Sequence, residues 1–119
     1  MQEDKLSARS LDFAVAVIEL VKDLKQKKET VISNQIGRSG TSIGANIHEA
    51  RYAHSKADFV AKLQIALKES NETAYWLELL FRTNYIDEAA YKSLDSACTS
   101  IRAMLVASIN PAKKNAQSQ

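Results

Sequence analysis

Two histidines and a glutamate form the pattern in this sequence that most resembles a catalytic motif. His48 and Glu49, followed by His54, are superficially like the helix of a zinc protease, whose two histidines lie four residues apart and so share one face. Here the histidines are six residues apart and diverge around a helix. A di-iron site needs a glutamate three residues before each histidine, but Ala45 and Arg51 occupy these positions. We expect no metal site and no cofactor.

The other candidate nucleophiles are a cysteine and several serines. Cys98 falls on the apolar side of a periodic segment, where a small core residue is expected rather than a reactive thiolate. Ser39, Ser42 and His48 form no recognisable triad, and the nearby glycines lack the lysine and the preceding strand of a phosphate-binding loop. We therefore expect no catalytic residue, no small-molecule substrate and no enzymatic activity.

The composition predicts one small all-α domain. The 119 residues include three glycines and one proline, too few for the turns of an all-β protein, and the net charge is +2. The single cysteine cannot form an internal disulfide, and no stretch resembles a secretory leader or an apolar span of about 20 residues. We expect a cytoplasmic protein that does not enter a membrane.

Four segments with helical periodicity follow one another along the chain. They cover residues 7–27, 30–53, 55–83 and 87–110. Thr30, Ser55 and Asp87 are the predicted N-caps of the last three. Because the connections are short, successive helices should run in opposite directions, which predicts an antiparallel up-down-up-down four-helix bundle.

The apolar positions of these segments define the predicted core and its limits. In the first segment the apolar face includes Val17 and Ile18. The core candidates of the other segments are Ile36, Ile43, Ile47, Phe59, Leu63, Leu67, Leu77, Leu94, Ile101 and Leu105. Pro111 should end the last helix, because the residue before a proline avoids helical geometry. We assign residues 1–111 to the bundle and 112–119 to a polar, disordered tail.

The second segment contains all three glycines, Gly37, Gly40 and Gly44. Each costs a helix about 1 kcal/mol relative to alanine, so some contact should offset about 3 kcal/mol if the costs add. Close approach of a neighbouring helix backbone is the first explanation. A local break in the helix is the second, and the pattern leaves both open.

A polar stripe runs beside the isoleucines of the same segment. Its members follow spacings of three, four, four and three residues and are Gln35, Arg38, Ser42, Asn46 and Glu49. They form either the solvated side of an amphipathic helix or a buried polar ladder that fixes the register between helices or subunits. A buried Arg38 would need an acidic partner, for which the candidates are Glu69, Glu72 and Glu78.

This stripe is part of a longer motif. Residues 33–50, SNQIGRSGTSIGANIHEA, resemble the signature of bacterial four-helix-bundle proteins, also called 23S rRNA intervening-sequence proteins. That signature has a glutamine, an arginine, a pair of small residues, Ser-Ile, Asn-Ile and a glutamate before a small residue, and all stand here in order. The segments 55–59, 66–70 and 72–80 match one branch of the family, and the resemblance extends over residues 10–105.

The resemblance implies a bundle that assembles and acts next to nucleic acid. The first family members resemble products of reading frames inserted within ribosomal RNA genes. A related branch comprises accessory proteins of diversity-generating retroelements, which are ring-shaped homopentamers with basic surfaces that bind nucleic acid beside a reverse transcriptase. The resemblance implies a homo-oligomer, with a pentamer as the first choice, while the net charge of +2 departs from that strongly basic ring.

Two groups of residues are candidates for contact with partners. Apolar residues of the third segment that fall off its main stripe predict either an oligomer interface or a third contact within the bundle. They are Ile65, Tyr75, Trp76 and Leu79. Basic residues near the corner of the second and third segments would contact RNA phosphates or form an ordinary solvated surface. They are Arg51, Lys56, Lys62 and Lys68.

These features favour a non-catalytic, self-assembling helical bundle that binds RNA or a nucleoprotein partner. The alternative is a purely structural or protein-interaction module without affinity for nucleic acid. Retention of RNA at low salt would distinguish the two, because phosphate contacts weaken as salt rises.

Overall fold

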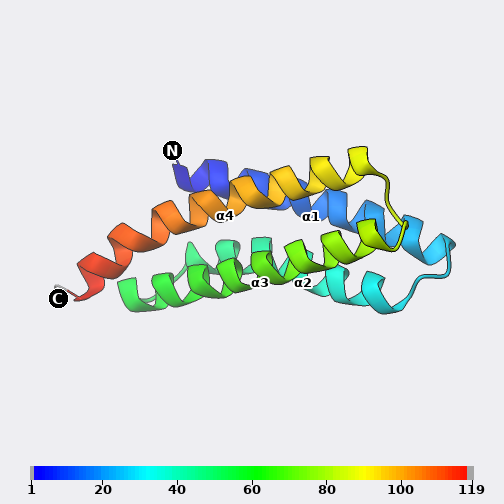
Figure 1. The fold of residues 1–119 in the computed structure, drawn as a ribbon. Helices are drawn as coiled ribbons and strands as arrows, with labels where there is room; N and C mark the ends of the chain where they lie inside the picture. The colour runs from blue at the N-terminus through cyan, green and yellow to red at the C-terminus, as the bar shows by residue number, and fades with distance from the viewer. Residues whose placement is uncertain (1, 118–119) are drawn as a thin grey trace.

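The structure, a computed structural model, describes residues 2–117 of the chain and the side chains of residues 5–114. It consists of the four helices α1 (Gln2–Gln26), α2 (Val31–Ala50), α3 (Lys56–Arg82) and α4 (Glu88–Gln117). Residues 2–117 contain no strand. The prediction of an all-α four-helix protein is therefore confirmed (Figure 1).

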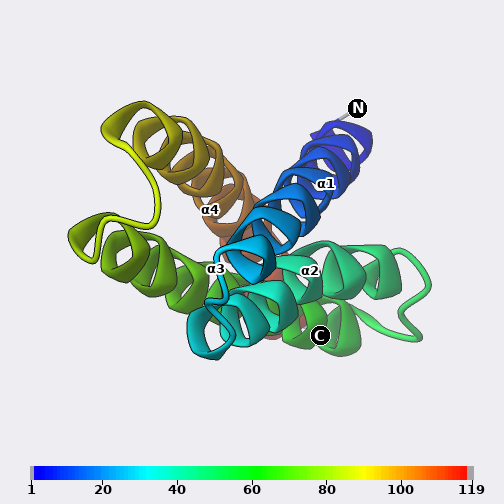
Figure 2. The same ribbon diagram turned by 90° about the vertical axis from the view of Figure 1, so that its right-hand side faces the viewer.

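The helices form an elongated bundle with extents of 51 × 21 × 21 Å. In Figure 1 the chain reverses direction at each connection, so the helices run up, down, up and down in chain order. α2 packs between α1 and α3, and α3 packs between α2 and α4. Figure 2, which views the bundle from one end, shows α1 and α3 at diagonally opposite corners. The outer sides of these two helices therefore point away from each other.

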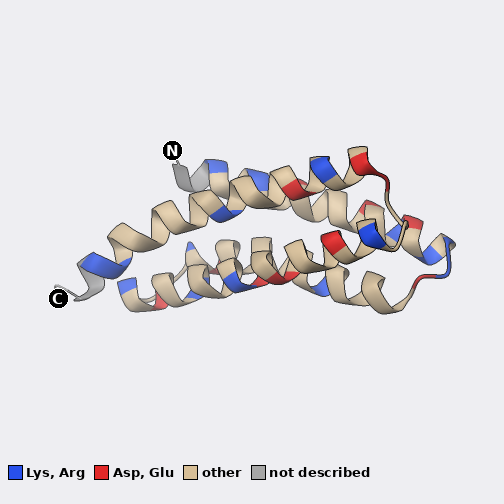
Figure 3. Ribbon diagram, viewed as in Figure 1, with Lys and Arg blue, Asp and Glu red and all other residues tan. Residues whose placement is uncertain are grey.

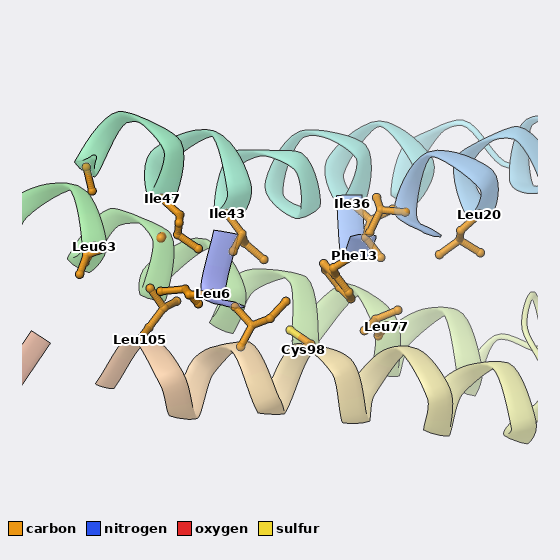
Figure 4. Close-up of a cluster of buried hydrophobic side chains, with 14 of the residues drawn as sticks. Leu6, Phe13, Leu20, Ile36, Ile43, Ile47, Leu63, Leu77, Cys98 and Leu105 are labelled. Atoms are coloured by element: carbon orange, nitrogen blue, oxygen red, sulfur yellow. The ribbon is translucent and has the colours of Figure 1, made fainter. Parts of the chain in front are cut away.

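The core runs along the bundle axis and draws aliphatic side chains from all four helices (Figure 4). Seven of the ten predicted core residues are buried, namely Ile36, Ile43, Ile47, Leu63, Leu77, Ile101 and Leu105. The other three, Phe59, Leu67 and Leu94, are half-buried and pack against this core. The helical spacing of the apolar residues thus predicted the buried face of α2, α3 and α4 correctly.

Side chains cap the helices at the predicted corners, with one correction. The Ser55 hydroxyl accepts a hydrogen bond from the Asp58 backbone N–H at 3.1 Å, and the Asp87 carboxylate accepts one from Ala90 at 2.8 Å. Thr30 takes the N-cap position of α2 as predicted, but its side chain makes no capping hydrogen bond. The preceding residue, Glu29, accepts the Ser33 N–H instead, at 2.8 Å.

The fourth helix does not end at Pro111 as predicted but continues to Gln117. A proline inside a helix leaves the carbonyl four residues earlier without its N–H donor, here that of Ala107. Ala107 is exposed, so water can satisfy this oxygen. Ile109 is buried and Ala112 packs against the core, which holds the helix together across the proline. Residues 118–119 of the predicted tail lie outside the described residues.

Candidate functional site

The polar stripe of α2 lies along the surface beside α3. Gln35, Arg38 and Glu49 are exposed, while Ser42 and Asn46 are half-buried. Within a single copy of the chain, the interpretation of these five residues as a buried ladder is therefore wrong, since none of them is buried. Whether the stripe fixes the register between copies remains a prediction.

Arg38 bridges from α2 to two acidic residues of α3. One guanidinium nitrogen lies 2.6 Å from a carboxylate oxygen of Glu69, and another contacts Glu72. Glu72 also accepts a hydrogen bond from the indole N–H of Trp76 at 3.1 Å. Of the three predicted partners, Glu69 and Glu72 are thus correct, whereas Glu78 pairs with Arg82 at 2.9 Å.

The contacts within this cluster lower the pKa of Glu72 and raise the pKa of Arg38. The Trp76 indole, followed by Arg38, holds the pKa of Glu72 below its ordinary value of 4.5. The two carboxylates in turn raise the pKa of Arg38, with the hydrogen bond to Glu72 as the largest cause. Glu69 is itself nearly buried, so a charged partner is needed to compensate its lost hydration. The cluster therefore locks α2 and α3 in one register.

A second polar contact between α2 and α3 lies beneath this cluster. The hydroxyl oxygens of Ser39 and Thr73 are 2.8 Å apart, and both residues are completely buried. The sequence analysis missed this pair. The available signal was that Ser39 follows Ile36 by three residues and so lies on the same inward face of the helix.

The three glycines lie where α2 meets α1, and α2 is unbroken across them. A β-carbon on Gly40 would lie 2.8 and 2.9 Å from the methyl carbons of Val17. One on Gly44 would lie 3.3 Å from the backbone oxygen of Ser10. The predicted close approach of a neighbouring backbone is thus found at Gly44, while at Gly37 and Gly40 the close neighbours are valine side chains, and the alternative of a local break is wrong.

Basic residues gather at one end of the bundle. Arg51, Lys56 and Lys62 surround the α2–α3 corner, and the end of α4 brings Lys113 and Lys114 to the same end (Figure 3). Lys68 does not join this group, because it lies twelve residues beyond Lys56, about 18 Å along α3. We call these five residues, without Lys68, the basic end.

The apolar residues singled out on α3 divide into two kinds. Ile65 and Tyr75 are 43% and 62% exposed. Trp76 and Leu79 are half-buried and pack against the core, which agrees with a contact inside the bundle for these two. Tyr75 and Trp76 meet edge to face, with ring centroids 5.0 Å apart. We call Ile65 and Tyr75 the α3 patch.

α1 carries an exposed aliphatic stripe that the sequence analysis missed. Leu11, Val15 and Ile18 are 66%, 57% and 42% exposed. The prediction that Ile18 shares the core face with Val17 was wrong, because adjacent residues point about 100° apart around a helix and Val17 takes the core position. The three residues are spaced four and three apart in the sequence, and this spacing could have identified them as a second face of the helix. We call these three residues the α1 stripe.

The described residues show no convergent catalytic group. Burial raises the pKa of the Cys98 thiol, which donates a hydrogen bond to the Ser70 carbonyl at 3.4 Å and so stays protonated. His48 is exposed with its ring 5.5 Å from that of Tyr52. Across the described residues, no three His, Cys, Asp or Glu side chains come together as metal ligands. Nor does any helix there combine the length and apolar character of a membrane span.

Comparisons with known proteins give the same architecture. The family model described as 23S rRNA-intervening sequence protein matches residues 2–107. A crystal structure from Bacteroides thetaiotaomicron VPI-5482, described as a protein with unknown function from the S23 ribosomal protein family, is 53% identical with a TM-score of 0.90. That match covers 92% of this chain and 98% of the other. No curated protein matches. The chain belongs to the family of 23S rRNA-intervening sequence proteins.

Proposed function

We propose that the chain is a cytoplasmic, non-catalytic bundle that assembles with copies of itself and binds RNA through its basic end. The observation that carries the proposal is the grouping of basic residues from separate parts of the chain at one end of the bundle (Figure 3). The family name, which refers to sequences that intervene in 23S rRNA, supports RNA as the nucleic acid.

Charge is divided unevenly along the bundle. At the basic end, two of the described side chains of the α2–α3 corner are acidic, those of Glu49 and Asp58. At the opposite end, three acidic residues accompany the four lysines at and just beyond the end of α1, and two of these lysines form ion pairs, Lys22 with Glu19 and Lys27 with Asp23. A net charge of +2 therefore hides a more positive end that suits phosphate groups.

The basic end fits the phosphate backbone rather than a particular base sequence. Lysine and arginine side chains that neutralise phosphates release counterions, which makes binding strongly dependent on salt. We therefore expect binding to structured RNA with little sequence preference. Assembly would multiply the contacts, because each copy adds another basic end to the same particle.

Self-assembly is the second part of the proposal. Apolar side chains are exposed in the α1 stripe and in the α3 patch, and exposed apolar patches on a small domain often mark an interface. The family resemblance supports a homo-oligomer and makes five copies the leading number. The polar stripe of α2 lies on the surface and would fix the register between copies.

The test measures binding of a structured RNA hairpin by fluorescence anisotropy at about 50 and about 200 mM salt. The variant reverses three charges of the basic end, Arg51→Glu, Lys56→Glu and Lys62→Glu. The matched control reverses three exposed lysines at the other end, Lys22→Glu, Lys25→Glu and Lys28→Glu. We expect the first variant to lose about tenfold or more in affinity and the control much less.

Two results would contradict the proposal. An equal loss in both variants would show that RNA responds to total charge rather than to the basic end. No RNA binding by the unmodified protein at low salt would support the alternative, a structural or protein-interaction module without affinity for nucleic acid.

A further inference from the structure

We propose that the ring of Tyr52 stacks on an unpaired RNA base while the basic end holds the phosphates on either side of that base. The inference rests on the proposed RNA binding and names the part of the RNA that the basic end selects, which is a loop, a bulge or a single-stranded end. Tyr52 lies in the turn between α2 and α3, directly after Arg51 and four residues before Lys56.

The ring of Tyr52 takes no part in the core. The residue is 70% exposed, whereas aromatic side chains usually contribute their large apolar area to the interior of a small domain. Tyr75 is the other exposed tyrosine, but its ring packs against Trp76. It also lies nineteen residues beyond Lys56, about 28 Å along α3. Tyr52 is therefore the exposed tyrosine that lies next to the basic residues.

The turn presents the Tyr52 ring from a fixed backbone. The Tyr52 N–H donates a hydrogen bond to the Glu49 carbonyl at 3.0 Å, which continues the last turn of α2. Further along the turn, the Asp58 carboxylate accepts the His54 N–H at 3.3 Å. The His48 ring lies against the Tyr52 ring, with centroids 5.5 Å apart and planes tilted by 58°. A side chain that is already ordered loses less conformational entropy when it binds a ligand.

An unpaired base is the ligand that suits an exposed ring among positive charges. Inside an RNA duplex each base is stacked between its neighbours, and proteins read unpaired bases by stacking them on aromatic side chains. Every base has such a face, so the contact tolerates different sequences. Arg51 and Lys56 place a positive charge on either side of Tyr52 along the turn, which suits the phosphates before and after the stacked base.

The test uses two RNA hairpins that have the same stem. One has a loop of uridines, and the other has a loop of abasic nucleotides, which keep every phosphate and sugar but carry no base. Fluorescence anisotropy gives the affinity of each hairpin for the unmodified protein and for Tyr52→Ala. We expect Tyr52→Ala to bind the uridine loop about five- to a hundredfold more weakly, the range for one stacked base, and to bind the abasic loop unchanged.

The matched control is Tyr52→Phe, which keeps the ring and removes the hydroxyl. It should bind both hairpins like the unmodified protein. The salt dependence of binding is a second readout. Tyr52→Ala should keep the slope of the unmodified protein, because stacking releases no phosphate counterions, whereas the charge reversal at the basic end should lower that slope. Circular dichroism and light scattering check that each variant keeps its helices and its mass.

Four results would overturn the inference and leave RNA binding by the basic end intact. Tyr52→Ala could bind the uridine loop as tightly as the unmodified protein, or lose equal affinity for both hairpins. Tyr52→Phe could lose as much as Tyr52→Ala, which would assign the contact to the hydroxyl. A changed mass of Tyr52→Ala would place the ring between copies of the chain. If the unmodified protein binds neither hairpin at low salt, the proposed function itself is refuted.

Discussion

Of the three glycines, Gly40 leaves the least room for a side chain. Its missing side chain leaves room for Val17, which is fully buried and cannot turn toward solvent. We expect Gly40→Ala to lower the free energy of unfolding by about 1–3 kcal/mol, even though alanine is the better helix former, and Gly40→Leu to lower it at least as much.

The matched comparison is Gly37→Ala. A β-carbon there would meet one methyl of Val21 at 3.3 Å, and Val21 is half-buried and able to shift. We expect this variant to be neutral or to gain up to about 1 kcal/mol from helix propensity. Urea denaturation of both variants is the measurement. A gain in stability for Gly40→Ala would contradict the close contact with Val17.

Glu72 makes the stability of the fold depend on pH. Because its pKa in the folded protein lies below the ordinary value of 4.5, its ionised form stabilises the fold fully above that pH. This contribution is lost as the pH falls through the folded-state pKa. Replacing the carboxylate by an amide, Glu72→Gln, should cost about 0.2–1 kcal/mol at neutral pH, as for a partly exposed ion pair.

The measurement is the free energy of unfolding from urea melts at a series of pH values between neutral and acid. The unmodified protein should lose stability below pH 4.5 more steeply than Glu72→Gln, because the variant has no proton to take up at this position. Parallel curves for the two proteins would contradict the role assigned to the Trp76–Glu72–Arg38 cluster.

Individual contacts followed from the sequence where one residue type required another. The hypothesis of a buried Arg38 gave three candidate acidic partners, and two of them, Glu69 and Glu72, pair with it although Arg38 itself is exposed. The Ser39–Thr73 contact could not be found in this way, because a buried hydroxyl can also bond to its own helix backbone, as Thr73 does with Glu69. Small polar residues therefore leave the choice of partner open until the helices are packed.

At the scale of the helices, the start of α2 depends on Glu29. Its buried carboxylate accepts the Ser33 N–H, one of the donors that the first turn of a helix leaves without a partner. We expect Glu29→Ala to cost about 1 kcal/mol and Thr30→Ala to cost little, since Thr30 makes no capping bond. Thermal melts of the two variants test this, and a larger loss for Thr30→Ala would return the capping role to that residue.

Periodicity located all four helices but not all of their faces and ends. Pro111 predicted a helix end, yet burial of Ile109 and contact of Ala112 with the core carry α4 beyond it. Ile18 was wrongly assigned to the core face of α1, because a run of apolar residues does not show which of them point into the core. Such choices depend on which neighbouring helix lies on each side, which a single segment does not specify.

At the scale of the whole molecule, the proposed function depends on surfaces that folding assembles from distant segments. The basic end joins the α2–α3 corner to the last turns of α4, about sixty residues later in the chain. The sequence analysis identified the corner but could not join Lys113 and Lys114 to it, because they were assigned to a tail. Likewise, the α1 stripe can be recognised as a surface only once it is known that Phe13, Val17 and Leu20 occupy the core positions of α1.

Self-assembly is the claim on which the account of this protein most depends, and the mass of the unmodified chain in solution tests it most directly. One copy has a mass of 13.2 kDa, so five copies would give about 66 kDa. We predict that size-exclusion chromatography with light scattering finds a particle of several copies, with five as the leading number. A mass that stays at 13.2 kDa, the mass of one copy, as the protein concentration rises would contradict the claim.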